Sequence, residues 1–498
     1  MSRTKSRTLS RRAALQTGAV LTLAPALARA QEATPIASPV STSEIERSGW
    51  FSYGQDLSGD KAQLDGLIDT SNVGSLAEIW RVPVGGPISA TPVISEGVVY
   101  VGSYDGLLYA RELQTGAEVW TYDTGARVIE PNLQIPLGIP GSAHVDWDVI
   151  YVGDSAAVLH AVDRASGQAI WKTTIDDQPN ACIWSSPVAS DGVVYVGSAS
   201  ISKESGFRGG VVAVDAATGE IIWHTFVVPA DAGGGGVFTV PAVDPVLGMV
   251  YVGTQNAYDA TTAPYGHPIA MLALDTATGE IAWSFDAPPN DGNTAPTDDV
   301  GFSASPNLFT ATIDGVERQL IGQGQKSGDF WVRDRQTGEK VWMTTVSPAG
   351  FLGGMEGTSA VANDIIVIPA TDWPVFDGPA SGSIQALQAS TGVALWTAEQ
   401  AAPVPAPVAI SNDLVFHGGL DGQLHAYALT TGEEVWSADL GASVSGGAAI
   451  QDGVVVLGAA TPQFAEFVKT GSDIVAFGVA ASATPIASPL PVQATPIG

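Results

Sequence analysis

Short runs of alternating apolar residues recur along the chain, separated by turns rich in glycine and aspartate. Runs such as "GVVYVGS" and "GVVAVD" have the period of two that is typical of β-strands. Between two such runs lies a segment of the form A-x-D-x-x-T-G-x-x-x-W, seen as "AVDAATGEIIW". Its aspartate can hydrogen-bond the turn backbone, and its glycine can adopt a positive φ without steric cost. The pattern therefore predicts antiparallel strands joined by tight turns, with a tryptophan ring presented to the neighbouring repeat.

This segment repeats in recognisable form seven times. The copies end at tryptophans spaced 40 to 60 residues apart: Trp120, Trp171, Trp223, Trp283, Trp342, Trp396 and Trp436. In the first repeat the alternation predicts four strands, at Ala90–Ser95, Val98–Gly102, Leu107–Arg111 and Glu118–Tyr122. Four-stranded repeats of this length are typical of β-propeller blades.

An eighth repeat is split between the two ends of the chain. Trp80, in "LAEIWRV", has the end of the pattern without its beginning, whereas Asp473–Val479 has the beginning without the end. Ala77–Val84 is therefore expected to supply the outer strand of a blade whose other three strands lie within Val444–Val479. The predicted fold is all-β, an eight-bladed β-propeller closed by its N-terminal strand.

The two ends of the chain differ in composition from the repeats. Residues 1–30 have the features of an export signal: Arg11-Arg12, an apolar run and the small-residue site Ala28-Arg29-Ala30. The paired arginines favour a twin-arginine signal, and an ordinary secretory signal is the alternative. Residues 31–49 and 481–498 read as a Pro-rich linker and a Pro-rich C-terminal tail, each containing "ATPIASP". The propeller is expected to span residues 50–480, in an exported protein that is periplasmic or extracellular.

Charge and cysteine content exclude several classes of function. The net charge is −30, and six of the 21 basic residues lie in the first 30 positions, where there is no acid. So acidic a chain repels phosphate backbones, which argues against nucleic-acid binding. The single Cys182 rules out an internal disulfide, a CxxCH haem attachment and a Cys-based zinc site. No apolar run after the signal has the length of a membrane span, so no transmembrane anchor is expected in the mature chain.

Polar residues that break the repeat gather in loops expected on one face of the ring. In a four-stranded blade, the loop entering the inner strand and the loop between the second and third strands lie on the same face. Glu204, Asn256, Asp298-Asp299 and Lys326 occupy such loops in three consecutive blades. Two carboxylates and an amide oxygen suit Ca²⁺, a further carboxylate could act as a general base, and a lysine could hydrogen-bond a carbonyl-bearing cofactor.

Each of these residues also has a simpler interpretation when taken alone. Glu204 could pair with Arg208 across a turn, which contributes about 0–1 kcal/mol at a surface. Asn256 could be a turn residue, and the two aspartates could be solvated loop acids. The set of four on adjacent blades favours a site. Glu356 is expected on the same face, where it could join that site or be solvated.

These loops and the tryptophan-terminated blades resemble the quinoprotein alcohol dehydrogenases, which carry pyrroloquinoline quinone (PQQ) and Ca²⁺ in an eight-bladed propeller. The E-x-G-x-R-G form matches Glu204–Gly209, and the G-T-G-N form matches Gly253–Asn256. The acidic pair and K-x-G-x-[FY]-[WY]-x-x-D-R match Asp298-Asp299 and Lys326–Arg335. "GQDLSGDKAQ", "GQGQKSG" and "GFLGGMEGTS" resemble the polyvinyl alcohol dehydrogenase branch in particular.

The resemblance implies a role for each of these residues. Calcium would be held by Glu204, Asn256 and Asp299, and Asp299 or Asp298 would remove the hydroxyl proton of an alcohol. Lys326 would hydrogen-bond the quinone. The implied substrates are secondary alcohols, small or polymeric. Electrons would pass to a separate acceptor such as a cytochrome c, because the chain has no haem-binding region.

The chain departs from the family at two points. Family members commonly carry two adjacent cysteines above the quinone, and only Cys182 is present here. The tryptophan expected beneath the quinone is matched by Phe238, whose stacking face is smaller, with Trp184 equivalently placed one blade earlier. These departures favour an alternative, a non-catalytic propeller of the same superfamily that acts as a binding or assembly scaffold. The retained loop residues favour the enzyme.

Overall fold

The structure is a computed structural model of the 498-residue chain. It describes residues 49–129, 136–201, 206–255, 266–287, 300–350, 353–373, 379–461 and 468–479. The chain divides into two units, residues 1–47 and 48–498, and every described residue lies in the second. The predicted signal peptide and C-terminal tail lie outside the described residues.

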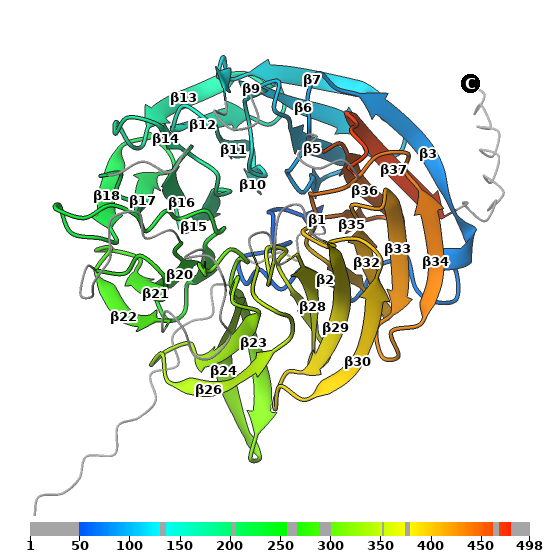
Figure 1. Ribbon diagram of the computed structural model, residues 1–498. Helices are drawn as coiled ribbons and strands as arrows, with labels where there is room; N and C mark the ends of the chain where they lie inside the picture. The colour runs from blue at the N-terminus through cyan, green and yellow to red at the C-terminus, as the bar shows by residue number, and fades with distance from the viewer. Residues whose placement is uncertain are drawn as a thin grey trace, which may run out of the picture. The chain divides into compact units, whose positions relative to one another are not determined.

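The described part of the chain contains eight sheets that are each built on four antiparallel strands, and one separate two-stranded sheet. Figure 1 shows them arranged around a common axis as the blades of a propeller. From inner to outer strand, blades 1 to 4 comprise β4–β7 (Val93–Ser95, Val98–Gly102, Leu107–Glu112, Glu118–Asp123), β10–β13 (His144–Asp146, Val149–Gly153, Val158–Asp163, Ala169–Thr174), β15–β18 (Val188–Ser190, Val193–Ser200, Gly210–Asp215, Ile221–Phe226) and β19–β22 (Ala242–Asp244, Met249–Gly253, Ala270–Asp275, Ile281–Asp286).

Blades 5 to 7 continue the ring and blade 8 closes it. They comprise β23–β26 (Asn307–Ile313, Val316–Gly324, Asp329–Asp334, Lys340–Thr345), β27–β30 (Ala360–Ala362, Ile365–Asp372, Ser381–Gln388, Ala394–Gln400), β31–β34 (Ala409–Ser411, Leu414–Gly418, Gln423–Ala428, Glu434–Asp439) and β35, β36, β37 and β3 (Ala449–Gln451, Val454–Ala459, Asp473–Val479, Leu76–Pro83). The short elements outside this scheme are β1 (Gly49–Trp50), β2 (Ala62–Gln63), β8 (Val128–Ile129), β9 (Pro136–Leu137), β14 (Ala181–Cys182) and the 3₁₀ turn η1 (Val73–Ser75).

The predicted split blade is confirmed. β3 pairs antiparallel with β37, from Leu76 opposite Val479 to Pro83 opposite Asp473. The outer strand of blade 8 thus comes from the start of the ring and its inner three strands from the end. The fold class is confirmed as an all-β, eight-bladed propeller.

The repeat tryptophans join neighbouring blades. Seven of them donate an indole N–H to a backbone carbonyl in the next blade's turn, at 2.8–3.1 Å, for example from Trp171 to Ala216. Each ring also lies against that turn's glycine, where a methyl group would come within 2.5–2.8 Å of the indole. Trp436 instead packs edge-on to Phe477, since blade 8 takes its outer strand from elsewhere and has no such turn. The predicted docking of each ring on the neighbouring repeat is confirmed.

The inner strand of blade 1 is shorter than predicted. The alternation indicated Ala90–Ser95, whereas β4 begins at Val93. The residues before β4 bond the neighbouring blade 8 instead: the Thr91 hydroxyl accepts a hydrogen bond of 3.1 Å from the Gly447 N–H. Serine and threonine side chains make equivalent links from Ser142 to Ser186, and from Val240 through Ser305 to Thr358.

A segment without any repeat, residues 49–63, occupies the centre of the ring, where Figure 1 draws it in blue. β1 pairs with β4, and β2 runs parallel to β31. Between them, backbone carbonyls accept hydrogen bonds from the inner strands of blades 2, 4, 5, 6 and 7; the donors are Val145, Val243, Leu308, Val361 and Ile410. Because these inner strands are otherwise unpaired on their axial edge, the segment satisfies groups that would be left in the channel.

Lys61 anchors this axial segment. It is fully buried, donates a hydrogen bond to the Tyr53 carbonyl, and its Nζ lies 3.6 Å from the centre of the Tyr53 ring. Burial lowers the pKa of Lys61 well below its usual value, and the neighbouring Asp60 carboxylate opposes that shift. Lysines are rarely buried unless they have a partner, and the partner of Lys61 here is Tyr53.

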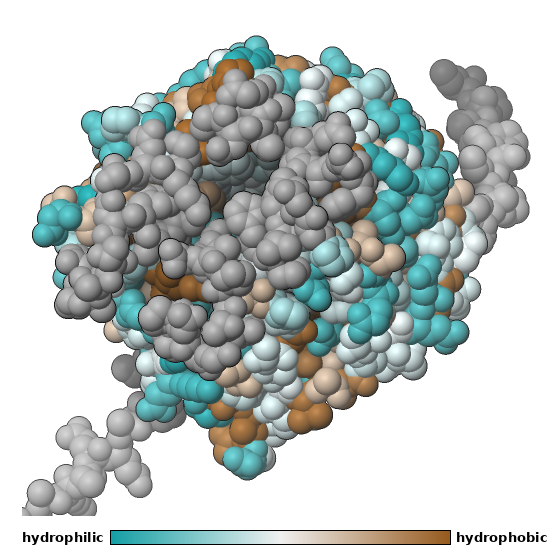
Figure 2. All heavy atoms as spheres, in the orientation of Figure 1, coloured by the Kyte–Doolittle hydropathy of each residue, from teal (hydrophilic) through white to brown (hydrophobic). Residues whose placement is uncertain are grey.

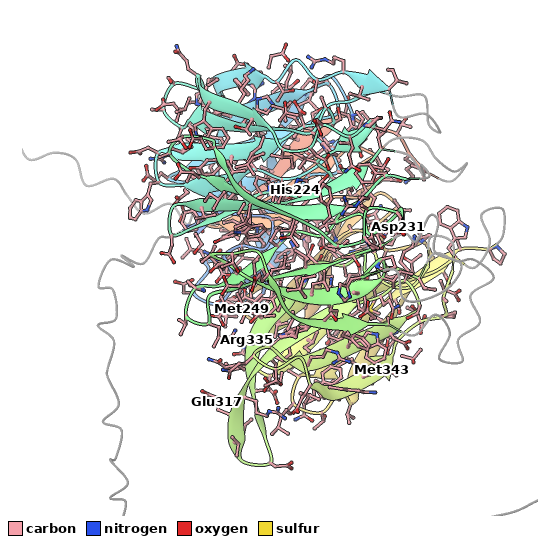
Figure 3. All side chains as sticks on the ribbon, turned by 90° about the vertical axis from the view of Figure 1, so that its left-hand side faces the viewer. His224, Asp231, Met249, Glu317, Arg335 and Met343 are labelled. Carbon is pink, nitrogen blue, oxygen red and sulfur yellow. The ribbon has the colours of Figure 1, made fainter. Side chains whose placement is uncertain are left out.

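The two faces of the ring carry different connections. Figure 3 shows Met249, Arg335 and Glu317 at one end of the sheets and Asp231 toward the other. The first end holds the tight turns, where Arg335 pairs with the buried Asp244 at 3.0 Å across blades 4 and 5. The other end holds the loops that enter the inner strands and those between the second and third strands. We call it the loop face; of the predicted site residues, Trp184, Phe238 and Lys326 lie there.

Candidate functional site

The floor of the loop face is built from one repeated position in every blade. The loop entering each inner strand carries an apolar residue that packs over a glycine of the preceding blade, as Ile183 does over Gly153. In seven blades this glycine lies in the second strand, and a methyl group there would lie 2.3–2.8 Å from the apolar side chain. We call the residue directly after the apolar one the axial position. In blades 1 to 8 it is Ser89, Pro140, Trp184, Phe238, Ser303, Glu356, Pro405 and Ser445. All except Pro140 are partly exposed.

Two adjacent axial positions are aromatic. The Trp184 and Phe238 rings lie with their centroids 6.2 Å apart and their planes tilted by 36°. The Trp184 indole N–H donates to the Ser200 carbonyl at 3.2 Å, which fixes that ring. The sequence placed these two residues in equivalent loops, and the structure brings them together as a partly exposed apolar floor.

Lys326 lies on the same loop face, in the loop between β24 and β25. Its backbone N–H donates to the Gly301 carbonyl at 2.9 Å, and its side chain is almost completely buried. The Nζ atom lies 3.3 Å from Glu356 Oε1. The loop itself is fixed by Gln325, which donates to the Val300 carbonyl at 2.7 Å and accepts from the Trp331 indole at 3.0 Å. A rigid loop thus holds a buried cation next to the axis.

Sequence reasoning missed two polar residues of the loop face, Ser303 and Gln255. Ser303 occupies the axial position of blade 5, and its hydroxyl donates to Gln255 Oε1 at 2.8 Å. The Gln255 N–H donates in turn to the Gly236 carbonyl at 3.0 Å. Aligning the eight repeats on the apolar residue that packs over glycine would have found Ser303. The Gln255 contact depends on Gly301, where a methyl group would lie 2.0 Å from the Gln255 Cβ.

The remaining predicted residues, Glu204, Asn256, Asp298 and Asp299, lie outside the described residues. Within the described ranges no group of three His, Cys, Asp or Glu side chains is arranged to hold a metal ion. The calcium site therefore stays a prediction.

Arg208, at the end of the predicted Glu204 motif, is firmly held. Its guanidinium donates to the Val228 carbonyl through Nε and Nη2, at 3.1 and 2.9 Å, and lies 4.0 Å from the centre of the Phe226 ring. Gln178 bonds both the N–H and the carbonyl of Arg208. Arg208 therefore fixes this end of the motif to blade 3 through both its backbone and its side chain.

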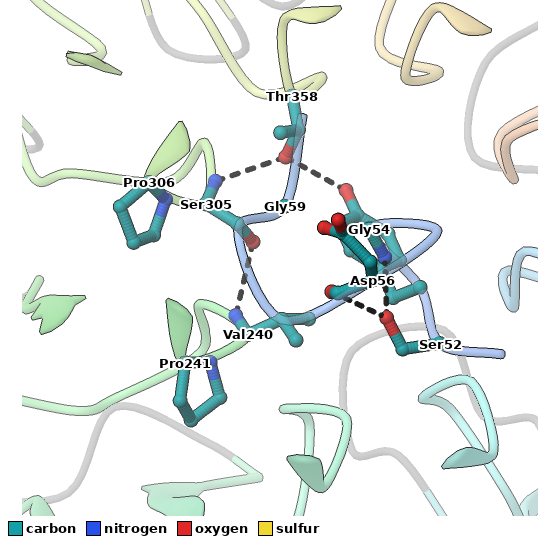
Figure 4. Close-up of a pocket in the computed structure, with 10 residues that line it drawn as sticks. Ser52, Gly54, Asp56, Gly59, Val240, Pro241, Ser305, Pro306 and Thr358 are labelled. Carbon is teal, nitrogen blue, oxygen red and sulfur yellow. Dashed lines mark hydrogen bonds between the residues drawn. The ribbon is translucent and has the colours of Figure 1, made fainter. Parts of the chain in front are cut away.

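A small cavity lies beside the axial segment. Figure 4 shows it lined by Ser52, Tyr53, Gly54, Asp56, Gly59, Val240, Pro241, Ser305, Pro306 and Thr358. Its volume of about 10 Å³ is close to the minimum for one water molecule. The Tyr53 hydroxyl lies 2.8 Å from the Thr358 hydroxyl at its edge. This cavity is too small for an organic ligand, so it belongs to the packing of the axial segment.

Cys182 and the outer surface add no chemistry to the site. The Cys182 thiol is fully buried and unpaired with another cysteine, and burial raises its pKa well above the usual value. Such a thiol is inert as a nucleophile. Hydrophilic side chains gather over the outer strands β3 and β34, at the right of Figure 2. Among the residues with described structure, no helix is long and apolar enough to cross a membrane.

Two family models match parts of the chain. Residues 229–350 match "Glucose/ethanol/alcohol dehydrogenase, beta-propeller domain", and residues 74–202 and 380–474 match "Outer membrane protein assembly factor BamB". The first match contains Lys326 and the axial positions of blades 4 and 5.

Among curated proteins, the polyvinylalcohol dehydrogenase of a Pseudomonas species is 27% identical over 387 residues, which cover 70% of this chain and 58% of that protein. The quinohemoprotein alcohol dehydrogenase ADH IIB of Pseudomonas putida is 28% identical over 329 residues, covering 59% of this chain and 46% of the relative. The chain thus spans about half the length of the curated relatives it matches. The predicted resemblance to PQQ-dependent alcohol dehydrogenases is confirmed.

Solved structures confirm the fold. The quinohemoprotein alcohol dehydrogenase of Comamonas testosteroni superposes with a TM-score of 0.75 at 21% identity, covering 87% of this chain and 80% of that one. BamB of Moraxella catarrhalis superposes with a TM-score of 0.56 at 15% identity, covering 81% and 99%.

Proposed function

We propose that this chain is a PQQ-dependent alcohol dehydrogenase that oxidises secondary alcohols, including polymeric ones. The observation that carries the proposal is a buried lysine, Lys326, on the same loop face as the aromatic floor of Trp184 and Phe238. A planar, carboxylated quinone needs an aromatic ring to stack on and a cation for its oxygens, and the described residues offer both. The similarity to polyvinylalcohol and quinohemoprotein alcohol dehydrogenases supports the same reaction class.

Each described residue has a separable task in this proposal. Bound quinone would supply the chemistry of accepting a hydride from the alcohol. Trp184 and Phe238 exclude water from one face of the site and set its plane. Lys326 presents N–H donors toward carbonyl or carboxylate oxygens, and its low exposure strengthens those hydrogen bonds. Ser303 keeps Gln255 in place at the edge of the floor.

The residues outside the described ranges complete the proposed machinery. Glu204, Asn256 and Asp299 would hold Ca²⁺ through oxygen ligands. Asp299, or its neighbour Asp298, would accept the hydroxyl proton as a general base. Electrons would leave to a separate acceptor of the cytochrome c kind, and the N-terminal 30 residues would direct export to the periplasm or the outside of the cell.

Reconstitution tests this proposal directly. The protein is loaded with PQQ and Ca²⁺, and oxidation of secondary alcohols is followed with an artificial electron acceptor. We expect turnover that Asp299→Asn reduces by at least about 10²-fold, the low end of general-base effects. Asp314→Asn, in an exposed turn of the same blade, is the matched control and should leave the rate unchanged. Equal rates in both variants would contradict the assignment of the base.

A second candidate function is a non-catalytic binding or assembly scaffold. The match of residues 74–202 and 380–474 to the BamB model supports it, as does Phe238 in place of the family's tryptophan. A scaffold, however, has no need of a buried lysine beside an aromatic floor. A folded ring that fails to bind PQQ would favour this second function.

A further inference from the structure

The axial positions differ in charge, and one of them stands apart. Of the eight, three are serine, two are proline and two are aromatic, whereas Glu356 alone carries a charge. It also pairs with Lys326, the cation assigned to the cofactor. The Glu356 side chain is 26% exposed and that of Lys326 is 7% exposed, so the carboxylate forms the solvent-side half of the pair.

The backbone around the pair fixes its geometry. The Met355 N–H, next to Glu356, donates to the carbonyl of Gln325, next to Lys326. Gly354, with φ of 71°, approaches so closely that a methyl group there would lie 2.3 Å from the Lys326 carbonyl oxygen. Gly354 is held in turn by reciprocal hydrogen bonds of 3.0 and 2.9 Å with Thr371 on β28. The loops of blades 5 and 6 are therefore locked together where the two charges meet.

An ion pair imposed by two locked loops differs from a pair of flexible surface side chains. The latter contribute little, because holding two long side chains in one arrangement costs entropy. Here the backbone has already placed both ends, and the lysine has lost most of its water. A nearly buried ammonium without a partner would be costly, and its four-carbon chain would be free to turn away from the axis.

We propose that Glu356 is a positioning residue of the cofactor site, whose carboxylate orients the Lys326 ammonium toward the ligand on the aromatic floor. This inference rests on the proposed function. A lysine ammonium has three donors, so a hydrogen bond to Glu356 is compatible with another to the ligand. Glu356 acts through Lys326 and takes no part in the chemistry.

A double-mutant cycle on PQQ binding tests this. The dissociation constant is measured in the calcium-loaded protein by quinone absorbance and tryptophan quenching, for wild type, Glu356→Gln, Lys326→Met and the double variant. We expect Glu356→Gln to weaken binding about tenfold in the wild-type background and less than twofold in the Lys326→Met background. Glu356→Asp, which keeps the charge, should retain most of the affinity.

Glu399→Gln is the matched control, since it removes the same charge from an exposed position on blade 6 and should leave affinity unchanged. Three results would overturn the inference while leaving the proposed function intact. These are no effect of Glu356→Gln, an equal effect in both Lys326 backgrounds, and tighter binding, which would mean that the carboxylate merely repels the ligand. If the wild-type protein does not bind PQQ, the proposed function fails and this inference fails with it.

Discussion

Two glycines of blade 3 separate the cost of backbone strain from the cost of crowding a docked tryptophan. Gly219 and Gly192 have nearly the same left-handed backbone, with φ of 77° and 79°. A methyl group added at Gly219 would lie 2.8 Å from the Trp171 ring and 2.9 Å from the Thr173 hydroxyl. The same group at Gly192 would meet nothing within 4 Å. Gly219→Ala and Gly192→Ala therefore share the cost of backbone strain, and only Gly219→Ala adds the cost of crowding the tryptophan.

The magnitudes follow from these contacts. A left-handed conformation costs an L-residue about 1–2 kcal/mol, which both variants lose from the free energy of unfolding. Forcing a methyl group into a filled contact costs about 1–3 kcal/mol more, because the ring must shift. Trp171 is held by its hydrogen bond to Ala216, and the Thr173 hydroxyl bonds the Gly219 carbonyl at 2.6 Å. We therefore expect a loss of about 2–5 kcal/mol for Gly219→Ala and about 1–2 kcal/mol for Gly192→Ala.

Guanidinium denaturation followed by tryptophan fluorescence measures both losses. A third comparison adds Gly219→Ala to Trp171→Ala, where the loss in the free energy of unfolding should be smaller, because only the backbone strain and the Thr173 contact remain. Equal losses for the two glycines would refute the reasoning. So would an unchanged penalty for Gly219→Ala once the indole has been removed, since the crowding would then lie elsewhere.

Three further predictions concern the axis, a strained turn and the aromatic floor. Because burial lowers the pKa of Lys61, the folded protein binds that proton less tightly than the unfolded chain does. The free energy of unfolding should therefore rise with pH up to the usual lysine range, and this rise between pH 7 and pH 10 should be smaller in Lys61→Met. Trp147 has a φ of 52° at a hairpin tip, a conformation that asparagine tolerates better than alanine, so Trp147→Asn should have a free energy of unfolding about 1 kcal/mol above that of Trp147→Ala. Equal values in guanidinium denaturation of the two variants would contradict the strain at this position. Phe238→Leu keeps an apolar side chain and removes the ring, so PQQ titration should show about 2- to 10-fold weaker binding, and unchanged affinity would place the stacking surface elsewhere.

The repeated part of this fold could be predicted from the sequence because every blade uses the same contact. Trp171 on Gly219 is one example, and the D-x-x-T-G turn supplies both the left-handed glycine and the aspartate that caps it: the Asp215 carboxylate accepts from the Thr218 N–H at 2.8 Å. The split between Trp80 and Asp473–Val479 gave the ring closure for the same reason. Periodicity carries information only where a contact recurs.

The axial segment and the pairing at the site could not be predicted in this way. Residues 49–63 occur once, and their partners are backbone groups, which leave no pattern in the side chains. The pair of Lys326 and Glu356 depends on the close approach of Gly354, a property of two loops in different blades. Phe238 was identified from the family resemblance and Trp184 from its equivalent place one blade earlier, whereas the calcium ligands stay a prediction from their loops and motifs.

Binding of PQQ to the purified apo-protein, with and without Ca²⁺, tests the central claim most directly. Quinone absorbance and the melting temperature are followed during the titration, for the wild type and for Glu204→Ala. The account predicts tight, calcium-dependent binding that raises the melting temperature and is weakened by Glu204→Ala. A well-folded ring that binds no PQQ under either condition would contradict it.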